Sequence, residues 1–418
     1  MPHDLQHSGC IMSMNTSAES PDSLFSFEFV ALSAISFLAF CNLSLFYGFN
    51  AYLEGLGVAA AWRGVLIGLE PATAFVLRPI ISPWLTPRNS VQVIGVGLVL
   101  IMLALLGYSQ AENLWTLGLI RMLHGAGFVV MISACVSVLV LFIPEGRSGQ
   151  GFGVFSITTL LPYAVLPPLV EPLLVAVGDA SRVYTLFSPL FVPALFLLPA
   201  VGRGVRRRVA DLPDKAMQRP RLKDLVEDLR TPGIPRLLTA NLLLFIATTT
   251  VFFYMKDHLS ALGGGNPGFF FSISTGATIL VRIACGKLLD RVNRAAMLGL
   301  FLLALAVCFL LFSLAETPDK ILILAGLYGV CLGFVMPQLN AAMFVISPRH
   351  LRGLNTNMML FTMDAGFWMG PMLAGTLLAM GVAYAELFLA FAVLPLAGSV
   401  IAWSMVGLLR VTQHNAEK

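Results

Sequence analysis

Residues 281–294 read Val-Arg-Ile-Ala-Cys-Gly-Lys-Leu-Leu-Asp-Arg-Val-Asn-Arg. Arg282 lies inside an apolar run, Gly286 follows it, and a charged pair begins at Asp290. A second apolar run starts at Ala295. A small residue allows a neighbouring helix to approach, and positive charges stay on the cytoplasmic side of a membrane. The stretch therefore indicates a membrane helix that ends in a tight, charged turn before the next helix.

The composition of the whole chain agrees with a membrane protein. Of its 418 residues, 57% are hydrophobic and 11% are charged, whereas roughly 25% are charged in an average soluble domain. Continuous apolar runs of roughly 20 residues recur along the chain, which is the length a helix needs to cross a hydrocarbon core. A β-barrel would require alternating strands instead. The sequence predicts an all-α integral membrane protein.

Turn signals divide the apolar runs into twelve predicted transmembrane helices. They cover 28–50, 61–84, 91–109, 114–142, 151–175, 183–201, 234–256, 267–289, 295–315, 320–346, 353–379 and 383–408. The longest loop between two predicted helices, residues 202–233, is polar and basic. We expect a disordered tail over 1–27, a six-helix bundle over 28–201, a cytoplasmic linker over 202–233, a second bundle over 234–408 and a tail over 409–418.

The distribution of Lys and Arg predicts the orientation. With both ends of the chain in the cytoplasm, nineteen of the 26 basic residues fall on the cytoplasmic side and four fall outside. Cytoplasmic loops carry such an excess. We therefore expect a multi-pass protein, with both termini cytoplasmic, in the inner membrane of a bacterium.

The two bundles show a weak internal repeat. At a shift of 204 residues, Gly64 aligns with Gly268 and Arg78 aligns with Arg282, without a gap. Matches between glycines are common in such sequences, but arginine inside an apolar helix is rare. The arginine pair therefore indicates two related halves.

These features resemble the major facilitator superfamily of secondary transporters. The resemblance lies in the six-plus-six architecture, in the charged turn that follows the eighth helix, and in Arg121 with glycines four and six residues later in the fourth helix. It extends over about residues 28–408. It implies alternating access around a site between the halves. The expected inner gate consists of Gly286, Asp290, Arg291 and Arg294.

Five charged residues lie inside the apolar runs, and each would cost about 2.5–3.5 kcal/mol if it faced lipid. They are Arg78, Arg121, Arg282, Glu70 and Asp364. They must therefore face one another or a polar cavity. Arg78 and Arg282 occupy equivalent positions, so a pseudo-two-fold axis would direct both toward one anion, which two guanidinium groups bind well. Alternatively, each arginine has an acidic partner or extends to the inner surface.

The buried acids are candidate proton carriers. A carboxyl group that has left water can exchange protons near neutral pH, and we assign this role to Glu70 and Asp364. The resemblance adds Arg121 to the proton-coupling group, and His124 lies one turn away from it. Each acid could equally be a permanent ion-pair partner, and His124 could simply be hydrogen-bonded.

Four further residues are candidates for the wall of the site. They are Asn241, Tyr163, Asn340 and Trp368. Each could equally serve helix–helix packing.

The sequence contains no catalytic constellation, no metal-binding cluster and no nucleotide-binding loop, so we expect neither an enzyme nor a bound cofactor. The leading hypothesis is a monomeric secondary transporter of a small organic solute, coupled to protons and acting in efflux as an antiporter. One alternative is organic-anion uptake or exchange through Arg78 and Arg282. An alternative of another class is a membrane sensor or scaffold that does not transport.

Overall fold

The computed structural model describes residues 24–81, 84–111, 113–143, 148–210, 229–231, 233–284, 293–348 and 351–408. Within these ranges every regular element is a helix. Most of the two predicted tails, most of the predicted linker and the turn at 285–292 lie outside the described residues.

The first half contains six membrane-spanning segments, several of which are broken by short 3-10 turns. They are α1 (Phe27–Ser44) with η1 (Leu45–Gly48) and α2 (Phe49–Gly55), α3 (Ala60–Ile81), α4 (Pro87–Gly107) with η3 (Tyr108–Gln110), α5 (Leu114–Leu139) with η4 (Val140–Phe142), α6 (Ser148–Val177), and α7 (Ala180–Phe187) with η6 (Ser188–Phe191) and α8 (Val192–Ala210). Helix α8 therefore continues into the predicted linker.

The second half repeats this plan. Its segments are α10 (Ile234–Ala261), α11 (Gly268–Ala284), α13 (Arg294–Leu314), α14 (Pro318–Ile346), α15 (Arg352–Ala379), and α16 (Tyr384–Phe391) with α17 (Val393–Trp403). Ten segments of the described chain are long and apolar enough to cross a membrane, and α11 and α15 complete the twelve. The predicted fold, two pseudo-symmetric six-helix bundles in a multi-pass membrane protein, is confirmed.

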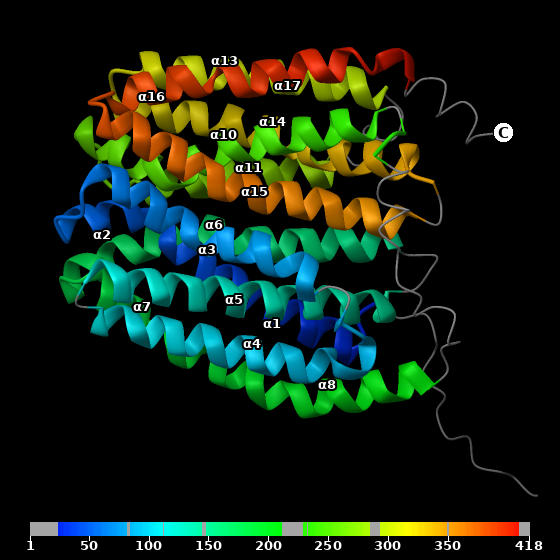
Figure 1. Ribbon diagram of the computed structural model, residues 1–418. Helices are drawn as coiled ribbons and strands as arrows, with labels where there is room; N and C mark the ends of the chain where they lie inside the picture. Colours follow the sequence, from blue (N-terminus) through cyan, green and yellow to red (C-terminus); the bar gives the residue numbers. More distant parts are fainter. Residues whose placement is uncertain are drawn as a thin grey trace, which may run out of the picture.

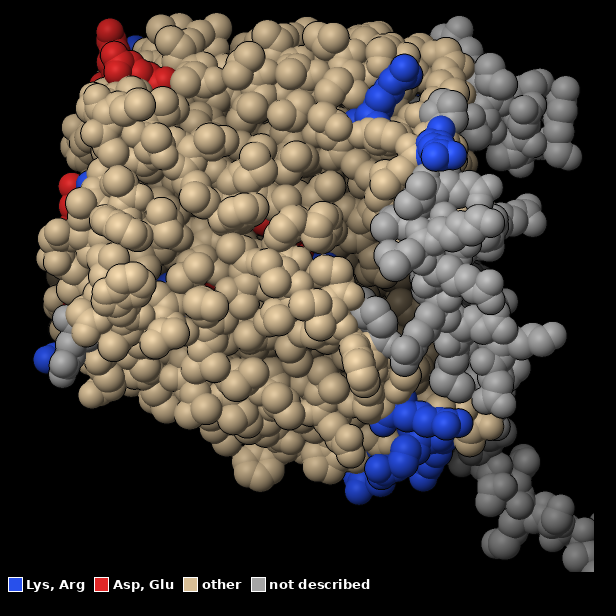
Figure 2. Space-filling view, in the orientation of Figure 1, with Lys and Arg blue, Asp and Glu red and all other residues tan. Residues whose placement is uncertain are grey.

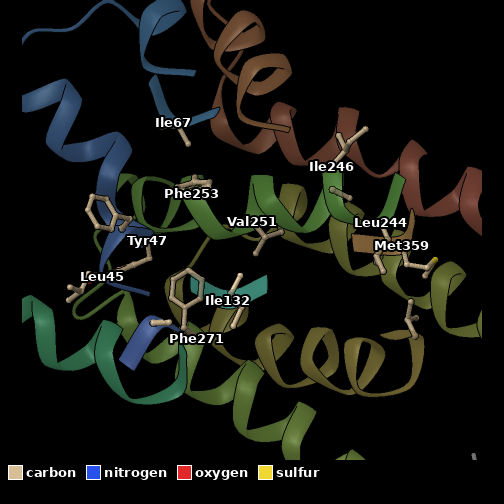
Figure 3. Close-up of a cluster of buried hydrophobic side chains, with 14 of the residues drawn as sticks. Leu45, Tyr47, Ile67, Ile132, Leu244, Ile246, Val251, Phe253, Phe271 and Met359 are labelled. Atoms are coloured by element: carbon tan, nitrogen blue, oxygen red, sulfur yellow. The ribbon is translucent and has the colours of Figure 1, made fainter. Parts of the chain in front are cut away.

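The two halves lie side by side along their length (Figure 1). Helix α3 packs along α15, α6 packs along α11, and η1 and α2 contact α10. One hydrophobic cluster continues from the first half into the second, and Figure 3 shows Tyr47 and Ile67 in it together with Leu244 and Phe271. The halves are therefore in direct contact through their cores.

The molecule has two chemically different ends. The linker end is where α1 begins, α8 ends and α10 begins, and the far end carries α2, α7 and α16 (Figure 1). Figure 2 shows Lys and Arg side chains gathered along the linker end, separated from the charges of the far end by a broad band in which only traces of charged side chains are visible. This band is the surface that a hydrocarbon core requires.

Candidate functional site

Helices α3 and α15 approach each other closely because small residues lie at their contact. A side chain on Gly64 would collide with the carbonyl of Pro371 and would lie 3.0 Å from Cα of Gly375. One turn further along α3, a Cβ on Gly68 would lie 2.8 Å from the carbonyl oxygen of Trp368. The absence of side chains at these glycines therefore allows the two backbones to approach closely. This brings the polar residues beyond the glycines within reach of each other.

Arg78 and Asp364 form an ion pair across this contact, between the two halves. The Arg78 Nε donates to Oδ2 of Asp364, and Nη2 donates to Oδ1 at 3.1 Å. Nη1 of Arg78 donates to Oγ of Ser133 at 3.2 Å. Both charged residues are 5% exposed. A two-point pair of this kind fixes orientation as well as charge, so it links α3 to α15 at a defined register.

A second buried ion pair lies wholly within the first half. Arg121 of α5 lies with its Nη2 2.9 Å from Oε2 of Glu70 on α3. The same guanidinium donates to the carbonyls of Leu66 at 3.1 Å and Ile67 at 2.9 Å, and to the hydroxyl of Tyr108 at 3.2 Å. Arg121 is completely buried. Four partners around one guanidinium offset the loss of water that burial imposes.

His124 lies next to this pair and is also completely buried. Its Nε2 is 2.6 Å from Nδ2 of Asn42, and its Nδ1 is 3.1 Å from the hydroxyl of Tyr108. Both ring nitrogens are thus occupied. Through Tyr108, His124 is connected to Arg121. This arrangement agrees with the hydrogen-bonded interpretation of His124, and its part in proton coupling remains a prediction.

Arg282 contacts the other half in a different way. Its Nη1 donates to Oγ of Ser156 on α6, and its Nε is buried with no hydrogen-bond acceptor among the residues that the structure describes. Among the described residues, no carboxylate lies within ion-pair distance of it. Arg78 and Arg282 both reach across the boundary between the halves, but they contact different helices and different chemical groups.

The four predicted wall residues have different surroundings. Asn241 donates at 2.9 Å to the carbonyl of Met359 and to Oγ1 of Thr362, so it joins α10 to α15. The Trp368 ring lies 5.7 Å from that of Phe75 across the boundary between the halves. The contacts of the other two wall residues, Tyr163 and Asn340, are of other kinds.

Among the described residues, no hydrogen bond joins the side chain of Tyr163 or Asn340 to another helix. Tyr163 joins an aromatic cluster, with ring centroids 6.3 Å from Phe40 and 5.5 Å from Phe252. Asn340 is exposed and donates to the carbonyl of Met336 in its own helix at 3.1 Å.

Polar contacts at the far end join the halves and were not anticipated from the sequence. Nζ of Lys256 lies 2.6 Å from Oε1 of Glu171, beneath the ring of Tyr47. Asn50 donates to Oδ2 of Asp257 at 2.8 Å. Glu171 and Lys256 each lie near a helix end in the sequence, where a charge is unremarkable, so only the fold reveals that they pair.

The prolines of α6 supply further contacts to the second half. Proline has no N–H, so it leaves the carbonyl four residues earlier without its helical donor. Pro168 frees the carbonyl of Ala164, which accepts from Oγ of Ser272. Pro172 frees the carbonyl of Pro168, which accepts from Nδ2 of Asn266 at 2.9 Å. The second half thus satisfies backbone groups that the first half leaves open.

The sequence model described as the Major Facilitator Superfamily matches residues 32–371. The chain belongs to the major facilitator superfamily. The resemblance proposed from the sequence is therefore confirmed, and the chain is a transporter of a small molecule across a membrane rather than a member of an enzyme family.

Relatives within the superfamily include the multidrug resistance protein MdtG of Escherichia fergusonii, which is 24% identical over 388 residues, covering 87% of this chain and 90% of that protein. The uncharacterized MFS-type transporter YuxJ of Bacillus subtilis is 23% identical over 391 residues, with coverage of 90% and 95%. The crystal structure of the nucleoside transporter NupG has a TM-score of 0.69 at 14% identity, covering 91% of this chain and 99% of that chain. The last similarity concerns the fold alone.

The charged turn that resembles the superfamily's gate is described only at its end. Gly286, Asp290 and Arg291 lie outside the described residues. Arg294 begins α13, where the side chain of Asn293 caps the helix by accepting from the backbone N–H of Ala296 at 3.0 Å. The Nε of Arg294 is buried and has no hydrogen-bond acceptor among the described residues. The gating assignment remains a prediction.

Proposed function

We propose that this superfamily member is an antiporter that exports a small organic solute in exchange for protons. The observation that carries the proposal is the buried ion pair between Arg78 and Asp364, which belong to opposite halves. Protonation of Asp364 would remove one charge of the pair and weaken the contact between α3 and α15. A proton that binds there changes the stability of the interface that alternating access must open and close.

The pair between Arg121 and Glu70 provides a second proton site within the first half. Because Arg121 also binds two backbone carbonyls and Tyr108, it stays in place when Glu70 is neutral. Glu70 can therefore gain and lose a proton without disassembling the bundle. His124 completes the group through Tyr108.

The direction of transport and the orientation are inferred from charge, contacts and relatives. The arginines at the end of α8 indicate that the linker end, with both chain termini, faces the cytoplasm of a bacterium. Contacts of η1 and α2 with α10 join the halves at the far end, and export requires that the solute enter from the cytoplasm. The name of the MdtG relatives, multidrug resistance protein, supports export. We propose a monomer in the inner membrane.

The test is a flux assay with the purified full-length protein in liposomes that carry a pH gradient and a pH-sensitive dye. A panel of anionic, neutral and cationic amphipathic solutes is added to the side that the linker end faces. Export coupled to protons predicts that a transported solute accelerates collapse of the pH gradient. Solute movement that leaves the pH gradient unchanged would refute proton coupling.

Organic-anion uptake or exchange is a second candidate because Arg282 has no carboxylate partner among the described residues. In the arrangement described, Arg78 is occupied by Asp364. Uptake would therefore rely on Arg282, or on Arg78 after Asp364 is protonated. The same liposomes distinguish the candidates, since exchange requires a counter-anion on the opposite side and does not require a pH gradient.

A further inference from the structure

We propose that the transported solute is an amphipathic organic oxyanion, whose charged group binds Arg282 and whose aromatic part lies against Tyr163. This inference rests on the proposed function, because it names the class of solute that the region between the halves accepts. It differs from the two-arginine site expected from the sequence, since Arg78 already has a carboxylate.

Three arginines and two carboxylates lie inside the described membrane-spanning helices between the two ends, so their charges do not cancel. Arg78 pairs with Asp364 and Arg121 pairs with Glu70, which leaves the guanidinium of Arg282 uncompensated. Arg282 is partly buried, with its Nε enclosed, and a cation inside a membrane without a counter-ion is costly. A solute that brings one negative charge would neutralise the region.

Arg282 is free to make additional hydrogen bonds. Its guanidinium has five N–H donors, and within the described part of the chain a single hydrogen bond goes from Nη1 to Ser156. The buried Nε has no acceptor in that part of the chain. A planar carboxylate or a phosphate-like group could accept from two of the remaining donors at once, which is the geometry that guanidinium groups favour.

The helix that carries Ser156 also carries an aromatic surface at a fixed distance. Tyr163 follows Ser156 by seven residues on α6, which is about two turns, so both face the same side roughly 10.5 Å apart. Ser156 and Tyr163 are each only partly buried. One face of α6 therefore presents the neighbourhood of a positive charge at one point and a ring at another.

The aromatic surface around Tyr163 is built by both halves. Tyr163 contacts Phe40 of α1 and Phe252 of α10, and Phe40 contacts Phe128 of α5 with ring centroids 5.9 Å apart. All four rings are partly exposed. Because Phe252 comes from the second half, these rings lie at the boundary between the halves. Rings pack favourably against another aromatic group in this way.

The test compares two probes of the same shape, 1-naphthoate and the neutral 1-naphthamide. Binding of each to the purified full-length protein is measured by calorimetry in detergent, without any ion gradient. We expect naphthoate to bind about tenfold or more tightly, as a charge-assisted two-point hydrogen bond would give. Arg282→Gln should abolish this preference, and Arg282→Lys should retain part of it because the charge remains without the planar fork.

Matched variants separate the two contacts. Tyr163→Leu should weaken both probes by the same factor, because it removes the ring and leaves the charge. Arg236→Gln removes an exposed positive charge at the start of α10 and should leave both affinities unchanged. Inorganic phosphate, added as a competitor, should displace naphthoate poorly because it lacks an aromatic part.

Three results would overturn the inference: equal binding of the two probes, binding of neither, or a naphthoate preference that survives Arg282→Gln. Displacement by phosphate at equal concentration would overturn the role of the aromatic surface. Failure of the inference is distinguishable from failure of the proposed function, because binding is measured without protons moving. Arg282-dependent binding together with proton-independent flux would refute only the antiport.

Discussion

The two contacts between the halves occupy equivalent positions and use different chemistry. Gly64 on α3 and Gly268 on α11, which the repeat aligns, both lie against the backbone of the opposite half. Further along the same helices, Arg78 meets a carboxylate, whereas Arg282 meets the hydroxyl of Ser156. The repeat therefore preserves how the halves pack and varies which charges they carry.

The same contrast holds inside the halves. Gly125 lies against the carbonyl of Glu70, and Gly329 lies against the carbonyl of Ser274, which is the position equivalent to Glu70. The packing of the helices is repeated, but only the first half has a carboxylate there, paired with Arg121. Backbone geometry is thus symmetric, while the candidate proton sites are not.

The largest expected effect comes from breaking the pair between the halves. Removing one partner of a buried ion pair costs about 3–5 kcal/mol because the other charge is left unpaired. Arg78→Gln or Asp364→Asn should therefore lower the unfolding temperature of the protein in detergent strongly. The double variant should recover much of the loss, since no isolated charge remains.

The exposed pair between Lys320 and Glu316, at 3.6 Å, supplies the control. Lys320→Gln should not change the unfolding temperature measurably, because exposed pairs contribute little. Single variants of the Arg78 pair that unfold like the wild type would show that the pair does not join the halves.

Glu70→Gln and Ser274→Ala test the asymmetry inside the halves. Glu70→Gln removes a charge-assisted hydrogen bond, worth about 1.5–3 kcal/mol, although three other partners hold Arg121. Ser274→Ala removes only a bond of 3.3 Å to its own helix. Thermal unfolding should show a clear loss for the first variant and little change for the second. Equal losses would contradict the asymmetry.

Gly64→Ala and Gly268→Ala test the symmetry of packing. Each new methyl group would meet backbone of the opposite half, and overpacking costs about 1–3 kcal/mol. We expect similar decreases in unfolding temperature. Gly276→Ala on α11 is the matched control, because nothing lies within 4 Å of its Cβ position. If only one of the first two variants is destabilised, the equivalence of the two contacts is wrong.

The smallest expected effect concerns the carbonyl that Pro168 frees. Ser272→Ala should cost about 1 kcal/mol, because the hydrogen bond to the partly buried carbonyl of Ala164 is lost. Adding Pro168→Ala restores the helical donor for Ala164, so the double variant should be more stable than Ser272→Ala. Ser313→Ala, whose hydroxyl bonds within its own helix at an exposed position, serves as control. A double variant less stable than the single would show that the carbonyl does not need Ser272.

Most of the fold could be predicted from the sequence because a membrane helix is identified by the length of its apolar run. The predicted ranges agree with the described helices within a few residues at most of their ends, with larger differences where α8 continues to Ala210 and α10 to Ala261. The rarity of arginine in such runs also drew attention to Arg78, Arg121 and Arg282, each of which contacts polar groups of another helix. Their roles in transport remain predictions.

The partners of these charges could not be predicted. Arg78 and Asp364 are separated by 286 positions, and the sequence was equally compatible with an anion held by two arginines. Likewise, the prolines of α6 were visible, but no local signal indicates that Ser272 and Asn266 would bind the carbonyls they free. Such pairings depend on how whole helices are placed against each other.

The most direct test of proton coupling at the boundary between the halves is solute-driven collapse of a pH gradient in liposomes that contain either wild type or Asp364→Asn. Both are compared at equal protein content, with correct folding verified by size-exclusion chromatography. We predict that solute accelerates proton movement in the wild type and that Asp364→Asn reduces this acceleration to the level of empty liposomes. Undiminished solute-driven proton movement in Asp364→Asn would contradict the account.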